Sequence, residues 1–295
     1  MILRSIALAA ALVALPAAAQ QYPTKPIRLL VPFGPGGVGD ITSRAVTQKM
    51  GEAMGQQVIV DNRPGASGIV AAETVAKSEP DGYTLYLMNN TNAVTAAMFK
   101  KLPYDTLRDF ETVSTIGGFS IVILVSPDSP AKTVKELIAQ AKGAGGKFNI
   151  GSINIGSTQH LAAELLKSLA ALDAAAVPFN NTGAVLTALR GGSVQVATEF
   201  VPAVLGQIRA NTLRAIAVGS TTRSPMLPNV PTLAESGLPG YDVVSWNGIA
   251  VAAKTPQPVI ERLNREIHAA VNSPVVAQRF QELGVSQNKA KIPRL

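Results

Sequence analysis

Segments patterned like β-strands and α-helices alternate along most of the 295-residue chain. Strand-like apolar runs fall at 27–31, 57–61, 83–88, 119–125, 147–152, 174–179, 194–200, 213–220 and 242–253. Helix-like segments fall at 38–55, 69–78, 132–143, 157–170 and 256–272, and a further helix is expected after the loop at 180–183. Thr133 and Glu136 are spaced as a capping box at the start of one of these helices. Repeated units of this kind predict an α/β fold with parallel sheets and helices on both faces.

A glycine-rich loop follows the first strand. Gly34, Gly36 and Gly39 have the spacing G-x-G-x-x-G, and Asp61 ends the next strand about 20 residues later. This arrangement is typical of a dinucleotide-binding βαβ unit, in which the acid binds the ribose. A Rossmann-type nucleotide-dependent enzyme is therefore one hypothesis. Pro35 argues against it, because a proline inside the loop has no N–H to donate to a phosphate.

The N-terminal residues have the pattern of a secretory signal peptide. Arg4 precedes an apolar run at 6–15, and small residues at Ala17 and Ala19 predict cleavage before Gln20. The run is too short for an ordinary transmembrane helix, which needs about 20 apolar residues. We therefore expect a signal peptide at 1–19 and a soluble mature protein in the periplasm, where a nucleotide-dependent enzyme would lack its cofactor.

Composition excludes several other classes. The chain has no cysteine, which removes disulfides and thiolate chemistry, and it has only two histidines and no H-E-x-x-H motif. We expect no metal and no cofactor. The net charge of +7 is scattered, with no basic run longer than Lys100-Lys101, so a nucleic-acid partner is not expected.

Loops rich in Gly, Ser, Thr and Asn follow most of the expected strands. In open α/β sheets, ligands bind at the carboxyl ends of strands, where loops and helix N-termini present backbone N–H groups. None of these loops has a Lys or Arg at its centre to bind a phosphate. The pattern favours a small carboxylate held by amide and hydroxyl groups.

Six sequence blocks, in order, resemble a known family of receptors. They are YPTKPIRLLVPFGPGGVGDITSR, VDNRPGASG, PDGYTL, NIGSTQHLAAELLK, RSPMLPNVPTLAESGLPGY and WNGIAVAAKTP. Together they resemble the Bug family, the TctC-like solute-binding receptors of tripartite tricarboxylate transporters, from Tyr22 to about Gly284. The resemblance implies a two-domain periplasmic binding protein (type II-like), with a cleft between two open, mostly parallel sheets flanked by helices.

The same resemblance implies a function without chemistry. The protein would capture a small organic anion, a di- or tricarboxylate or a related compound, and pass it to transient membrane partners, TctA/TctB-like transporter subunits or a sensor domain. It would act as a monomer. The alternatives that stay open are an exported hydrolase-like enzyme using the same cleft and the nucleotide-dependent enzyme above.

The resemblance also assigns ligand-binding positions. On the first lobe these are Phe33, Gly36, Gly37, Ser67, Gly68, Asn90 and Thr91. On the second lobe they are Gly156, Ser157, Thr158, Asn180, Asn181, Thr182, Gly183 and Glu199. Relatives read nearer to PYKG where this chain has PFNNTG, and have an acid-Asn pair near TEF, so the ligand is not carried over. Glu199 is unfavourable in an anion site, and would point away or accept a hydrogen bond from an amine or hydroxyl of the ligand.

Other polar residues are expected to have structural roles. Asp61 would face solvent or pair with Arg63, and Asp40 would cap its helix and pair with Arg44, although a place on the cleft wall stays open for Asp40. Trp246 would pack in the core or between the domains.

Ser157 and His160 are close enough in sequence to be weighed as a catalytic pair. No G-x-S-x-G motif accompanies them. A histidine that hydrogen-bonds locally or lines the cleft is the expected alternative, and no catalytic residue is assigned.

We expect lobe 1 to comprise 20–118 and 222–295, and lobe 2 to comprise 119–221, with chain crossings near Gly118 and Thr221. The family usually continues after ELGV with a further helix, whereas this chain ends at SQNKAKIPRL. The resemblance therefore leads us to expect a truncated or diverged member of reduced stability.

Overall fold

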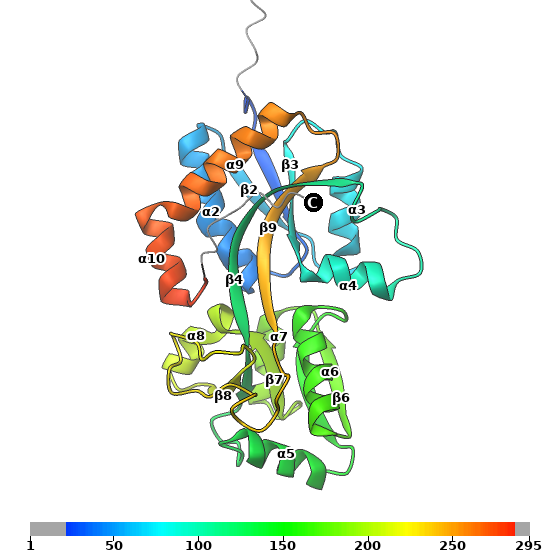
Figure 1. Ribbon diagram of the computed structural model, residues 1–295, viewed down its shortest axis with the longest axis vertical. Coiled ribbons are helices and arrows are strands. Elements are labelled where there is room, and N and C mark those ends of the chain that lie inside the picture. The colour runs from blue at the N-terminus through cyan, green and yellow to red at the C-terminus, as the bar shows by residue number, and fades with distance from the viewer. Residues whose placement is uncertain (1–21, 287–295) are drawn as a thin grey trace, which may run out of the picture.

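The computed structural model describes residues 22–286, which form two lobes joined by two long strands (Figure 1). The signal peptide expected at 1–19 and the end of the chain at 287–295 lie outside the described residues. The two-domain α/β architecture predicted from the sequence is confirmed.

Lobe 1 is built around three parallel strands in the order β2-β1-β3. These are β1 (Ile27–Val31), β2 (Val58–Asn62) and β3 (Thr84–Asn89). Its helices are α2 (Val38–Met54), a 3-10 turn η2 (Ala66–Gly68), α3 (Ile69–Ala76), α4 (Asn90–Met98), α9 (Gln257–Asn272) and α10 (Pro274–Leu283). Helices α2, α9 and α10 cover one face of the sheet and α3 covers the other (Figure 1).

Lobe 2 has the same layered arrangement. Its strands are β5 (Phe148–Ile153), β6 (Ala174–Phe179), β7 (Val196–Phe200) and β8 (Arg214–Val218). Its helices are α5 (Val134–Gly143), α6 (Thr158–Ala170), α7 (Thr182–Arg190) and α8 (Val201–Arg209). Side chains of α5 and α6 pack on one face and those of α7 and α8 on the other. The expected capping box of Thr133 and Glu136 is present at the start of α5.

The lobes share two strands, β4 (Phe110–Val125) and β9 (Val244–Ala252). They run antiparallel to each other, and β4 passes from the upper lobe into the lower one in Figure 1. The sheets therefore form one continuous path, β2-β1-β3-β9-β4-β7-β5-β6, with β8 added on β4. Parallel pairing is confined to the outer strands of each lobe, because the shared strands pair antiparallel with their neighbours.

The chain was expected to return from lobe 2 to lobe 1 near Thr221, but the segment after that residue packs with lobe 2. The segment 220–243 stays with lobe 2, where Leu233, Leu238 and Tyr241 are buried in the core beneath α5 and α6. The hydroxyl of Tyr241 donates to the carbonyl of Ala162 at 2.8 Å. We therefore propose lobe boundaries within β4 at Gly118 and within β9 at Ser245.

None of the helices within residues 22–286 is both long enough and apolar enough to cross a membrane.

Candidate functional site

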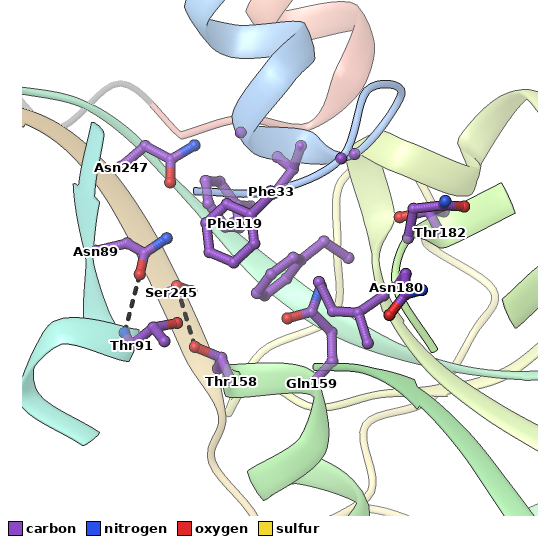
Figure 2. A pocket seen from close by; sticks show the side chains of 17 residues that line it. Phe33, Asn89, Thr91, Phe119, Thr158, Gln159, Asn180, Thr182, Ser245 and Asn247 are labelled. Atoms are coloured by element: carbon purple, nitrogen blue, oxygen red, sulfur yellow. Dashed lines mark hydrogen bonds between the residues drawn. The ribbon is translucent and has the colours of Figure 1, made fainter. Parts of the chain in front are cut away.

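A small enclosed pocket lies between the lobes, beside the two shared strands (Figure 2). Its lining from lobe 1 is Phe33, Gly34, Gly37, Val38, Gly39, Asn89 and Thr91. Its lining from lobe 2 is Ile153, Thr158, Gln159, Asn180, Asn181, Thr182 and Phe200. The shared strands add Phe119, Ser245 and Asn247. The pocket therefore lies where both lobes and both crossings meet.

Five helices begin at this pocket. The N-cap residues of α2, α4, α7 and α8 line it, and α6 contributes its first two residues, Thr158 and Gln159. Each N-terminus carries unpaired backbone N–H groups and about half a positive charge. Two of these helices belong to lobe 1 and three to lobe 2, so an anion between the lobes experiences a favourable potential from both sides.

The helix starts are fixed by local sequence. The side-chain oxygens of Asn89, Ser157 and Asn181 accept hydrogen bonds from backbone N–H groups of Thr91, His160 and Ala184 at 2.9, 3.1 and 2.9 Å. Asn and Ser are preferred N-caps for this reason. The polar residues after the strands thus start α4, α6 and α7 at the pocket wall, whereas α2 and α8 begin without a side-chain cap.

The glycine-rich loop is held in shape by an acid that does not reach the pocket. Gly36 has a φ of +81°, which glycine adopts without strain, and its N–H donates to Asp40 Oδ2 at 3.0 Å. Arg44 Nε donates to Asp40 Oδ1 at 2.9 Å. Burial raises the pKa of Asp40, but hydrogen bonds from Arg44, Gly36 and Asn62 outweigh it and hold the pKa below its ordinary value. The expected Asp40–Arg44 ion pair is therefore present.

Part of the pocket wall is apolar. The rings of Phe119 and Phe200 meet edge to face with centroids 4.6 Å apart, and Phe33 and Ile153 complete the apolar surface. No lysine, arginine or histidine among residues 22–286 lines the pocket. Polar contact with a ligand must therefore come from amides, hydroxyls and backbone groups.

Direct contacts between the lobes surround the pocket. Ser67 Oγ donates to the carbonyl of Ile155 at 2.6 Å, Asn90 Nδ2 donates to the carbonyl of Val244 at 3.2 Å, and Thr158 Oγ1 lies 3.5 Å from Ser245 Oγ. The enclosed volume is about 20 Å³, close to the space that one water molecule needs. A larger ligand therefore requires the lobes to separate, both to enter and to be accommodated.

The structure brings together some of the residues expected to bind ligand. Phe33, Gly37, Thr91, Thr158, Asn180, Asn181 and Thr182 line the pocket. Gly36, Ser67, Gly68, Asn90, Gly156, Ser157, Gly183 and Glu199 do not. Two of the second group, Ser67 and Asn90, form hydrogen bonds between the lobes instead.

Several lining residues were not anticipated. The most informative are Asn89, Gln159, Ser245 and Asn247, all of which are buried polar residues. In β9, Ser245 and Asn247 alternate with the exposed Val244 and Trp246. This two-residue period in an otherwise apolar strand was the signal that could have identified them.

Ser157 and His160 are not arranged as a nucleophile and base. Ser157 Oγ donates to the carbonyl of Ile153 at 2.6 Å and accepts from the backbone of His160. The imidazole faces Ser152, whose Oγ lies 3.3 Å from Nδ1, and burial lowers the pKa of His160. Both residues thus have local structural partners.

The other two residues singled out in the sequence are on the surface. Asp61 pairs with Arg63 at 3.0 Å and with Arg28, in place of any ribose contact. Trp246 was expected to be packed, but its side chain lies over Gly248 on a shared strand and the residue is 37% exposed.

Glu199 lies immediately behind the pocket and is fully buried. Its Oε2 accepts from Gln159 Nε2 at 3.3 Å and from the N–H of Phe200 at 3.0 Å, while Oε1 has no hydrogen-bond partner among the described residues. Burial raises the pKa of this carboxyl, and the nearby Thr182 hydroxyl and the hydrogen bonds from Phe200 and Gln159 offset only part of that effect.

The raised pKa of Glu199 predicts a pH-dependent stability. The unfolded chain releases this proton near pH 4.5, whereas the folded protein retains it to higher pH. The stabilisation is complete below pH 4.5 and is lost as the pH rises through the folded-state pKa, by about 1.4 kcal/mol for each pH unit that separates the folded and unfolded pKa values. Urea unfolding across this range should show Glu199→Gln gaining stability relative to wild type as the pH rises. The exposed control Glu111→Gln should not, and a pH-independent difference for Glu199→Gln would contradict the assignment.

The two lobes, the shared strands and the enclosed pocket are those of a periplasmic binding protein. MatC from Rhodopseudomonas palustris, solved with bound malate, superimposes with a TM-score of 0.85 at 30% identity over 92% of each chain. Rpa4515 from the same organism, solved with adipate, gives a TM-score of 0.86 at 32% identity over 90% of this chain and 89% of that one.

The sequence comparisons identify the family. The model described as "Tripartite tricarboxylate transporter family receptor" (TctC) matches residues 42–291. The protein BugT of Bordetella pertussis is 35% identical over 283 residues, which are 95% of this chain and 87% of BugT. The chain belongs to the TctC family of receptors, so the resemblance seen in the six sequence blocks is confirmed.

Proposed function

We propose that the protein is a periplasmic receptor that captures a small organic anion carrying one or more carboxylates. The observation that carries the proposal is the convergence of five helix N-termini on an enclosed pocket without a cationic lining among the described residues. A carboxylate binds to helix N-termini through N–H groups and the helix dipole. The malate and adipate held by MatC and Rpa4515 support the same ligand class.

The receptor delivers its ligand without transforming it. Ser157 and His160 are occupied by local hydrogen bonds, and no group of three His, Asp or Glu side chains among residues 22–286 could hold a metal. Lobe closure around the ligand would present the closed surface to membrane transporter subunits or to a sensor domain. The protein acts as a soluble monomer in the periplasm after removal of residues 1–19.

Binding is tested on protein recovered from the periplasm of cells that express the full chain. N-terminal sequencing should begin at Gln20, and a retained Met1 would contradict export by cleavage. A thermal-shift screen against mono-, di- and tricarboxylates, aromatic acids, amino acids and NAD should show a selective rise with a carboxylate. At 100 times its dissociation constant, a ligand stabilises by about 2.7 kcal/mol. A rise with NAD alone would overturn the proposal, and turnover abolished by Ser157→Ala would revive the enzyme hypothesis.

A further inference from the structure

Two side-chain amides in the pocket are held so that their oxygens face the cavity. They are Gln159 at the start of α6 and Asn247 on β9, and both point into the pocket in Figure 2. The orientation of each is imposed by a buried residue behind the wall, Glu199 for Gln159 and Thr42 for Asn247.

Glu199 fixes the orientation of Gln159. Glu199 Oε2 accepts from the N–H of Phe200 at 3.0 Å and Oε1 has no partner among the described residues, so a proton on this carboxyl resides on Oε1 and Oε2 stays an acceptor. The group of Gln159 that lies 3.3 Å from it must therefore be the NH2 donor, Nε2. The carbonyl end of the Gln159 amide is left facing the cavity.

Thr42 fixes the orientation of the Asn247 amide in a similar way. Thr42 Oγ1 donates its one hydrogen to the carbonyl of Val38 at 2.8 Å, as residues one turn apart in α2. It can then only accept from Asn247, whose Nδ2 lies 2.9 Å away. Thr42 and Asn247 are 0% and 1% exposed, so the hydrogen bond between them is shielded from bulk solvent. Asn247 Oδ1 is directed to the cavity.

These two oxygens limit what the pocket can hold. Neither accepts a hydrogen bond from another group among residues 22–286. A ligand with ionised carboxylates alone offers acceptors only, so neither oxygen would receive a hydrogen bond from the ligand itself in a closed site. An unpaired buried acceptor is unfavourable, and a site built to bind a donor discriminates strongly against the analogue that lacks it.

We propose that the ligand is a carboxylate that also carries a hydrogen-bond donor, a hydroxyl or an ammonium group, which donates to Gln159 and Asn247. The inference rests on the proposed carboxylate receptor and narrows its ligand class. Glu199 and Thr42 act as positioning residues, since they act on the ligand through Gln159 and Asn247. Hydroxyl and ammonium are distinguished by the experiment.

The test compares matched pairs of ligands by isothermal titration calorimetry. Succinate is compared with malate and with aspartate, glutarate with 2-hydroxyglutarate, and adipate with 2-hydroxyadipate. The donor-bearing member of at least one pair should bind ten-fold or more tightly than its parent acid. Equal affinity within every pair overturns the inference and leaves the carboxylate receptor standing. Failure of every acid in the panel to bind overturns both.

Variants then test the orientation mechanism. Gln159→Met removes one oriented oxygen, and Thr42→Val removes the hydroxyl that orients Asn247. Each variant should reduce the preference for the donor-bearing acid at least three-fold. Glu199→Met should do the same, because it leaves the Gln159 amide without the acceptor that orients it. Glu199→Gln should keep the preference, because the N–H of Phe200 holds the glutamine oxygen where Glu199 Oε2 lies and that oxygen still accepts from Gln159.

Two exposed positions supply matched controls. Gln278 donates to Glu282 at 3.0 Å and Thr74 donates to the carbonyl of Val70 at 2.7 Å, both remote from the pocket. Gln278→Met and Thr74→Val should therefore leave the affinity ratio unchanged. A ratio unaffected by Gln159→Met, Thr42→Val and Glu199→Met would overturn the assignment of these residues.

Discussion

Replacing Gly34 with leucine is expected to lower the affinity for a carboxylate by 100-fold or more while both lobes stay folded. Gly34 lies in the glycine-rich loop of lobe 1 and faces Asn181 of lobe 2. A Cβ at position 34 would lie 2.9 Å from the Cβ of Asn181, closer than real Cβ contacts allow. The backbone at 34 has no positive φ that would oppose a side chain, so the conflict arises only between the lobes.

The loss follows from the coupling of binding to closure. A ligand shifts a two-state equilibrium only as far as its differential affinity for the closed form allows. A leucine that holds the lobes apart removes the contacts of one wall, and a 100-fold loss corresponds to about 2.7 kcal/mol.

Calorimetry and small-angle scattering check this prediction together. Ligand should contract the wild-type protein in solution and leave Gly34→Leu unchanged. Gly206→Leu is the control, because position 206 has no atom within 4 Å of the added Cβ and lies in α8 away from the pocket lining. Wild-type affinity and contraction in Gly34→Leu would show that the loop does not meet Asn181 in the bound state.

The sequence predicted the elements well because their signals are local. The strand at 27–31, the capping box of Thr133 and Glu136 and the helix ending near Asn272 all depend on residues within one or two turns. Helices α4, α8 and α10 and the length of β4 were not predicted. The first half of β4, from Phe110, is interrupted by Ser114, Thr115 and two glycines, and those residues pair with β9, a strand distant in sequence.

The site was predicted only in part, for a related reason. Polar loops after strands pointed to the carboxyl edge of each sheet, and the family resemblance added Thr158, Asn181 and Thr182, which line the pocket. They could not show which polar residues turn inward and which form contacts between the lobes, because that depends on how the lobes meet. Ser67 is the clearest example, since its hydroxyl crosses to Ile155 in place of facing the pocket.

The sequence places the return crossing near Thr221, whereas we propose it at Ser245, because the segment between these residues lacks regular structure and its pattern does not reveal which lobe it joins. Residues 220–243 contain turns and a single bridge between Val218 and Thr232. Their attachment to lobe 2 comes from long-range burial of Leu233 and Tyr241, which periodicity does not reveal. The two crossings are therefore neighbouring antiparallel strands.

Phe280→Ala is expected to cost the largest amount of stability, about 3–5 kcal/mol, because the ring is fully buried. Phe280 lies in α10 and packs in the lobe 1 core with residues of α2, α9 and β4. The chain just beyond this helix pairs with the crossing strand, where the N–H of each of Gly118 and Ser286 donates to the carbonyl of the other at 2.8 Å. A cavity at position 280 thus weakens both the lobe 1 core and the pairing of Ser286 with Gly118 on β4.

Urea unfolding should show this loss as a lower midpoint for Phe280→Ala. Val275→Ala provides the control in the same helix, because Val275 is 64% exposed and its truncation should change stability by no more than about 0.5 kcal/mol. If Phe280→Ala were as stable as Val275→Ala, α10 would not be packed on lobe 1 in solution. A loss of several kcal/mol confined to Phe280 instead identifies α10 as an integral part of the lobe, because an exposed or detached helix has no buried ring to lose.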